Sequence, residues 1–451
     1  MATATLPAGP KGGLLTGHLS HFRAGPITFL DRCVREYGDF VLLRIGFKKI
    51  LLVSDPAAIE EVLITKSRDF IKHFGLKQTR QLLGDGLLNS EGEFWLRQRR
   101  LAQPAFHRDR IQQYGRDMID HARRMLAGWH DGDRRDLVVE MMELTLKIAA
   151  KTLFDAEETG DAAVIREQLA KSIRLFNERF ISLIRLPLGW PTPQNLKMRG
   201  VTRRLNEIIH KYIAQRRREG VGDRHDLLSL LLHAKDEAGD GTGMTDAQLR
   251  DEVMTLFLAG QETTALALSW TWYLLCGHPE VEDRLVAELR DVLGDRPLTV
   301  EDVPRLKYAE AVINESMRLH PPAYVLGREA IRDTSVGGHH VPKGWTVFMA
   351  QSVLHRDPRW WREPDRFRPE RWLDGSTKNL PKFAYFPFGG GPRICIGNTF
   401  AMMETVVVLA EVARRFHFER TDAEPIEPIP SITVRPSRPL NVVLHERRPP
   451  A

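Results

Sequence analysis

One helical segment limits the folds open to this chain more than any other feature. Thr245-Asp-Ala-Gln248 is a capping box, in which the first and fourth residues exchange hydrogen bonds with the backbone, so a helix is predicted to begin there. Apolar residues then continue to Cys276 and occupy most faces of the second half. A helix that is apolar on most faces is buried. The sequence therefore predicts a central helix enclosed by many others.

The remaining pattern also favours helices. Hydrophobic periodicity, together with residues that start or end helices, predicts several further helices. They are expected at 26–37, from Asp55-Pro56 onward, through most of 93–235 with a break at 186–193, from Pro279 onward, in a segment that ends near His320, and at 397–416. Strand-like runs lie at 40–44, at 49–54, after Pro321-Pro322 and, as an alternating pair, at 432–444. We expect an irregular segment at 1–25 and a long loop at 66–92. No linker or repeat divides 26–451, which we interpret as one domain.

Composition excludes several classes of protein. The chain has 451 residues and only three cysteines, Cys33, Cys276 and Cys395, which are too few and too far apart for a disulfide scaffold. No apolar run reaches the ~20 residues that span a bilayer, so we expect no transmembrane anchor and a cytoplasmic protein. The net charge of +6 is spread over amphipathic helices without an aromatic and basic recognition motif, which argues against nucleic acid as a partner.

A glycine-rich loop, Phe388 to Gly397, holds Cys395 just before a predicted helix. Amide donors at a helix N-terminus favour a thiolate, and the glycines, beginning with Gly389, let the backbone approach a flat, bulky group. Arg393 lies two residues before Cys395 in the sequence, and its positive charge suits an anionic substituent on that flat group. A haem fits this description, with iron on the sulfur and a propionate on the arginine. The alternative is an ordinary turn with a buried thiol, and the loop alone leaves both open.

The middle of the long apolar helix has the sequence Ala259-Gly260-Gln-Glu262-Thr263-Thr264. A glycine, an acid and two threonines have low helix propensity or do not suit an apolar helix. One interpretation is a local helix distortion over a bound molecule, with a hydroxyl and a carboxylate that manage protons. The other is a polar face turned toward a neighbouring element or a glycine used for helix packing, and taken alone this second interpretation is favoured.

Two further pairs have helical spacing. Glu315 and Arg318 share one face of an apolar helix, and Arg371 can join them in a buried structural network. Trp95 and Arg99 also share a face, and both are donors suited to a carboxylate, although taken alone the pair is better explained by an ordinary amphipathic helix. There is no HExxH, Walker or GxSxG motif, and the sixteen histidines do not cluster at metal-ligand spacing.

Five motifs, taken in this order and spacing, resemble the cytochrome P450 superfamily of haem-thiolate monooxygenases, and its soluble bacterial members in particular. They are Trp95…Arg99, Ala259 to Thr263, Glu315-x-x-Arg318, Pro369-Glu-Arg371 and Phe388 to Gly397. The resemblance spans roughly residues 26 to 445. It implies a mainly α fold with a smaller β-rich lobe, and a haem b cofactor.

The resemblance also implies a role for each matching residue. Cys395 would be the iron ligand, in a loop with Gly389 and Gly397, and Phe388 would tune the sulfur. The donors to the haem propionates would be Trp95, Arg99, Arg328 and Arg393. Ala259 and Gly260 would border the oxygen pocket, and Glu262 and Thr263 would deliver protons. Glu315, Arg318 and Arg371 would form the structural triad.

The implied reaction is hydroxylation of a C–H bond with O2. Because the chain ends at 451, we expect no fused reductase. Electrons from NAD(P)H would arrive through a ferredoxin or flavodoxin and its reductase, which we expect to dock on a basic face that includes Arg97 and Arg100. We expect a monomer. The alternatives are a peroxide-driven peroxygenase and a haem-thiolate sensor without turnover, and the Glu262-Thr263 pair argues against both.

The substrate is expected to be lipophilic: a fatty acid, a terpenoid or a steroid. By resemblance it would contact residues 66–92, Ala323, Val325, Leu326 and Ile432. An apolar lip from Phe176 to Trp190 would form an entrance or touch a membrane, although ordinary packing explains that lip equally well.

Overall fold

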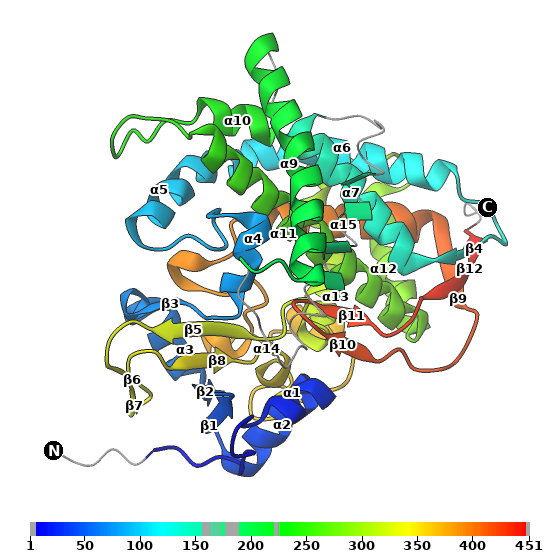
Figure 1. Ribbon diagram of the computed structural model, residues 1–451. Coiled ribbons are helices and arrows are strands. Elements are labelled where there is room, and N and C mark those ends of the chain that lie inside the picture. The colour runs from blue at the N-terminus through cyan, green and yellow to red at the C-terminus, as the bar shows by residue number, and fades with distance from the viewer. Residues whose placement is uncertain are drawn as a thin grey trace.

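The computed structural model describes residues 6–155, 164–165, 167–168, 171–172, 174–175, 189–220, 224 and 226–447. Over this part of the chain, helices dominate and small sheets lie around them (Figure 1). The α-helices are α1 (Leu19–Ala24), α2 (Pro26–Tyr37), α3 (Pro56–Glu60), α4 (Arg80–Leu83), α5 (Gly92–Ala102), α6 (Arg108–Ala127), α7 (Leu137–Phe154), α9 (Pro193–Glu219), α10 (Leu227–His233), α11 (Asp246–Cys276), α12 (Pro279–Leu293), α13 (Lys307–Leu319), α14 (Gln351–Leu354) and α15 (Asn398–Arg415).

The predicted central helix is α11, and Figure 1 places it near the middle of the molecule. The predicted capping box is present: Gln248 N–H donates to Thr245 Oγ1, and Thr245 N–H donates to Gln248 Oε1. Helices α7, α9, α13 and α15 pack around α11. Its second half is buried, and Trp270 donates its indole N–H to Val434 O over 3.0 Å. The apolar pattern of the sequence thus specifies the centre of the fold.

The strands are β1 (Phe40–Ile45), β2 (Lys48–Val53), β3 (Phe70–Lys72), β4 (Arg134–Asp136), β5 (Leu326–Ala330), β6 (Thr334–Val336), β7 (His339–Val341), β8 (Thr346–Met349), β9 (Phe416–Arg420), β10 (Pro428–Pro430), β11 (Val434–Pro436) and β12 (Asn441–Glu446). The largest sheet has the order β1-β2-β8-β5-β3, in which only β2 and β8 run parallel. It lies at the lower left of Figure 1, with α1 and α2 beside it at the bottom, and the β4-β12-β9 sheet lies at the right.

The predicted structural network is present and fully buried. The Glu315 carboxylate accepts hydrogen bonds from Arg318 Nε and Nη2 and from Arg371 Nε, each over 2.9 Å. Trp372 Nε1 and the Arg368 amide each donate to the same carboxylate over 3.0 Å. The network joins α13 to the 3₁₀ turn Pro369–Trp372. It therefore fixes the segment that leads toward the Cys395 loop.

Three predictions need correction. Residues 1–25 are not wholly irregular, because α1 forms there and the Gly13–Gly17 loop bonds back to β1. The predicted loop 66–92 contains β3 and α4 together with short 3₁₀ turns. The tail strands do not pair with each other: β11 pairs with β10, and β12 pairs with β4 and β9. Within the described residues, no helix is long and apolar enough to cross a bilayer.

Candidate active site

The loop around Cys395 requires glycine at particular positions. Gly389 and Gly391 have φ angles of +72° and +68°, which side chains of L-residues rarely adopt. A Cβ atom on Gly391 would lie 1.8 Å from Leu63 O, and one on Gly390 would lie 2.3 Å from the Phe383 ring. The loop is thus pressed against protein on one side. This explains the glycine run that the sequence showed.

The surroundings of Cys395 affect the ionisation of its thiol. Cys395 is accessible to solvent, yet protein atoms surround it closely enough for desolvation to raise the pKa of its thiol. A hydrogen bond from the Gly397 amide and the charge of Arg99 act in the opposite direction, toward a thiolate. The Cys395 amide donates to Phe388 O over 3.0 Å, and helix α15 begins only at Asn398. Arg99 Nη1 donates to Ile394 O over 3.0 Å, so α5 also supports the loop.

A group of buried and half-buried cations lies near the Cys395 loop. Arg393 stacks on the Trp95 ring, with 3.9 Å from the guanidinium carbon to the ring centre, and its side chain binds Ser90 O and Glu91. The Arg328 guanidinium is buried, and among the described residues its hydrogen bond is to Gly327 O, over 3.0 Å. Burial and the charge of Arg393 lower the pKa of Arg328 to about 10. The predicted residues Trp95, Arg328 and Arg393 are thus brought together.

Lys72 completes this group and was missed from the sequence. It is the direct register partner of Arg328 on the adjacent strand, where like charges destabilise a sheet. Burial, with the charges of Arg393 and Arg328, lowers the pKa of Lys72 to about 6. The Lys72 amide donates to Glu91 Oε1 over 2.8 Å. The only sequence signal was a lysine inside an apparent loop, and its position opposite Arg328 depends on long-range strand pairing.

The polar centre of α11 faces open space at two positions. Ala259 is exposed, and a Cβ atom on Gly260 would meet nothing within 4 Å, although the surrounding helix is buried. Thr263 donates its hydroxyl to Ala259 O over 2.7 Å, and Thr264 donates to Gly260 O over 2.9 Å. Both threonines therefore bond back to the preceding turn of the helix. α11 nevertheless remains α-helical throughout, so the local distortion that was one of the two interpretations is not present.

Glu262 is held by the turn between β10 and β11. Its Oε1 accepts hydrogen bonds from Thr433 Oγ1 and Arg435 Nε, each over 2.8 Å. Sequence reasoning missed Arg435, because the tail was predicted to pair with itself. The turn carries the exposed residue Ile432.

The expected substrate contacts lie on neighbouring segments. Val434 N–H donates to Pro322 O over 2.9 Å, which ties the Ile432 turn to the segment that carries Ala323, Val325 and Leu326. These three residues are half-buried. Of the predicted apolar lip, 176–188 lies outside the described residues, and Trp190 is exposed.

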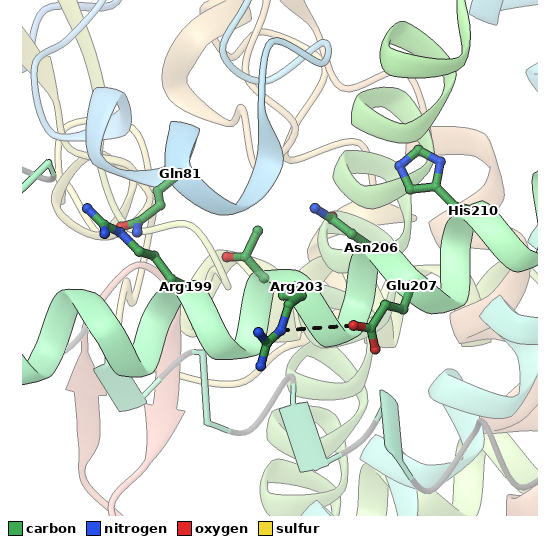
Figure 2. A pocket seen from close by; sticks show the side chains of 7 residues that line it. Gln81, Arg199, Arg203, Asn206, Glu207 and His210 are labelled. Carbon is green, nitrogen blue, oxygen red and sulfur yellow. Dashed lines mark ion pairs between the residues drawn. The ribbon is translucent and has the colours of Figure 1, made fainter. Parts of the chain in front are cut away.

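A cavity of about 440 Å³ lies elsewhere, between α4 and α9. Figure 2 shows Gln81 on one side and Arg199, Arg203, Asn206, Glu207 and His210 along α9 on the other. Every residue that lines it has a polar side chain, and none of them is predicted for the haem site. We therefore assign it no part in the reaction.

The predicted docking role of Arg97 and Arg100 is not supported. Arg100 binds Asp236 through Nε and Nη2, over 2.9 and 2.8 Å. Arg97 Nη2 donates to Gly243 O over 2.9 Å and to Thr242 Oγ1 over 2.7 Å. Both guanidiniums hold α5 against the connection between α10 and α11. Neither is therefore free to meet an acidic partner protein.

The residues present fit a haem. Cys395 offers an accessible sulfur ligand, and the Ala259–Gly260 surface is open at Gly260, where an added Cβ would meet nothing within 4 Å. Arg328 is buried and Lys72 and Arg393 are half-buried, and desolvation lowers the pKa of each of these cations. A bound anion would raise these pKa values again. A propionate-bearing macrocycle supplies a metal for the sulfur and carboxylates for the cations.

Comparisons with known proteins agree with this geometry. The cytochrome P450 family model matches residues 7–444. The chain is 35% identical to a cyclooctat-9-en-7-ol 5-monooxygenase from Streptomyces melanosporofaciens, over 95% of this chain and 91% of that protein. It is 33% identical to a pentalenene oxygenase from Streptomyces avermitilis, over the full length of both. The crystal structure of the cytochrome P450DA haem domain superposes with a TM-score of 0.90 at 28% identity, covering 99% of this chain and 98% of that one. The chain belongs to the cytochrome P450 family and is a P450 monooxygenase.

Proposed function

We propose that this monooxygenase hydroxylates a C–H bond of a cyclic terpenoid and receives its electrons from a separate ferredoxin or flavodoxin. The observation that carries the substrate class is the similarity to relatives named for pentalenene and for cyclooctat-9-en-7-ol. Both names describe cyclic alkenes, which favours a terpenoid over the fatty acids and steroids that the sequence also left open.

The proposed haem site uses residues from segments far apart in the sequence. Cys395 would ligate the iron, and Lys72, Arg328, Arg393 and Trp95 would hold the propionates. When bound, the haem supplies the oxidation, because thiolate ligation favours cleavage of the O–O bond of O2. The protein has to orient the substrate, exclude water and deliver protons.

Thr263 is suited to proton delivery at the open face of α11. Its O–H is donated to Ala259 O, so both lone pairs of Oγ1 remain available to accept a hydrogen bond from water. Glu262, next in the chain, is anchored by Arg435 and Thr433. We infer that Thr263 handles the proton and that Glu262 joins α11 to the turn carrying Ile432, where the substrate would lie.

The test is turnover of a panel of cyclic terpenes, fatty acids and steroids by the haem-loaded enzyme. One arm supplies NADPH with a ferredoxin and its reductase under ¹⁸O2, and the other supplies hydrogen peroxide. We expect a hydroxylated terpene that carries ¹⁸O in the first arm. Product in the peroxide arm alone would identify a peroxygenase. Tight binding without product in either arm would favour the sensor.

A further inference from the structure

A buried carboxyl outside the site described above is the starting observation. The Glu252 side chain, in the first half of α11, is 1% exposed. Its Oε2 accepts the Leu87 amide N–H over 3.0 Å. Its Oε1 is buried without a hydrogen-bond partner among the described residues. Because an unpaired buried carboxyl is costly, its presence in an apolar helix calls for a reason.

The backbone of a single residue, Leu87, connects Glu252 to the cation group. The N–H of Leu87 points to Glu252, and the C=O of Leu87 accepts a hydrogen bond from Lys72 Nζ. Beyond Lys72, Glu91 accepts from the Lys72 amide and pairs with Arg393. A continuous chain of polar contacts therefore runs from α11 to the loop of the proposed iron ligand.

Few charges face Glu252 from its neighbours. Asp251 lies next to it on α11, but its carboxylate is engaged by Arg250 and by the Asp85 amide, over 2.7 and 2.8 Å. Lys72 is the charge that faces it from β3. The net pKa of Glu252 is raised to about 8: burial raises it most, the hydrogen bond from Leu87 and the charge of Lys72 lower it, and Asp251 raises it. Near neutral pH the carboxyl is thus mainly protonated.

We propose that Glu252 is a positioning residue for the haem edge: through Leu87 it holds Lys72 at the propionates, and its ionisation sets the charge on that side of the haem. The inference rests on the haem site proposed above. A negative charge near the haem disfavours uptake of an electron by the iron. Glu252 would therefore tune the reduction potential without touching substrate or cofactor.

The test is the haem midpoint potential of the holoenzyme, measured by spectroelectrochemistry from pH 6.5 to 9.5. In the wild type we expect the potential to fall as Glu252 ionises, near pH 8 or above it, since the propionates oppose a further negative charge. Glu252→Gln, which is neutral at every pH, should lack this step. Asp251→Asn is the matched control and should retain the step. A step of equal size in Glu252→Gln, or none in the wild type, would overturn the proposal.

A second variant keeps the test decisive if Glu252→Gln folds poorly. Lys72→Met removes the cation that favours the ionised carboxyl, so the step should move to higher pH in the molecules that retain haem. A step that stays in place would count against the link through Leu87. If no variant or wild-type protein shows thiolate-ligated haem, the proposed function itself fails. If the haem is normal and the potential does not respond to Glu252, only this inference fails.

Discussion

Glu315→Gln replaces the carboxylate of the buried network with an uncharged amide. We expect this substitution to lower the free energy of unfolding strongly. Glu315 and Arg318 are 0% exposed and Arg371 is 2% exposed. The variant would leave two buried guanidiniums without an anion and would point an amide NH2 at groups that are themselves donors. Removing one partner of a buried ion pair costs about 3–5 kcal/mol. With two guanidiniums stranded, we expect the upper part of that range.

Urea unfolding followed by far-UV circular dichroism measures this cost. With a slope of about 3 kcal/mol per M, a loss in the upper part of that range lowers the urea midpoint by roughly 1 to 1.5 M, and a steeper slope makes the shift proportionally smaller. Glu310→Gln, on the same helix, is the control. Its partner is Lys307 at 3.3 Å, and the side chains are 47% and 62% exposed, so the pair is worth about 0–1 kcal/mol. If both variants shift the midpoint equally, the argument from burial is wrong.

Three further predictions address the site and the fold. Arg328→Met should speed transfer of haem to apomyoglobin by about 10-fold or more, because a charge-assisted hydrogen bond contributes ~1.5–3 kcal/mol. Arg332→Met, at an exposed position, is the control and should leave the transfer rate unchanged. Equal rates for the two variants would refute the role of Arg328 at the propionates. Thr263→Ala should lower product per NADPH consumed by up to about 100-fold and release hydrogen peroxide, whereas unchanged coupling would show that the hydroxyl delivers no proton. Burial lowers the pKa of His355 to about 3, and its Nε2 accepts a hydrogen bond from the Phe386 amide over 3.0 Å. Below pH 6.5 the folded state therefore binds fewer protons than the unfolded state. The free energy of unfolding should fall as the pH drops from 6.5 toward 3. At pH 5.5 the loss is on the order of 1 kcal/mol, and His355→Gln should flatten that part of the stability profile, whereas a profile as steep as that of the wild type would contradict the assignment.

The parts of the fold that could be predicted from the sequence are those specified by local signals. The start of α11 follows from Thr245 and Gln248, and the pairing of β1 with β2 follows from two apolar runs joined by a tight turn. The spacing of Glu315 and Arg318 placed both on one face of α13, where they are found. In each case residues close in the sequence determine the contact.

The missed features depend on contacts between distant segments. Strand β3 has only three residues and is stabilised by pairing with β5, so nothing around Lys72 marked it as a strand. Arg435 reaches Glu262 because β11 pairs with β10 rather than with β12. Arg97 and Arg100 looked like free surface charges because Asp236 is more than a hundred residues away in the chain. Strand register and ion pairs between distant residues do not produce a periodic pattern in the sequence, so sequence analysis does not detect them.

The bond between the Cys395 sulfur and haem iron is the central claim of this account. Its most direct test is the absorption spectrum of the haem-loaded, reduced protein with carbon monoxide, recorded for the wild type and for Cys395→Ser. Thiolate ligation predicts a strongly red-shifted Soret band in the wild type that is absent from the variant. A wild-type spectrum typical of histidine ligation, or the same band in Cys395→Ser, would contradict it.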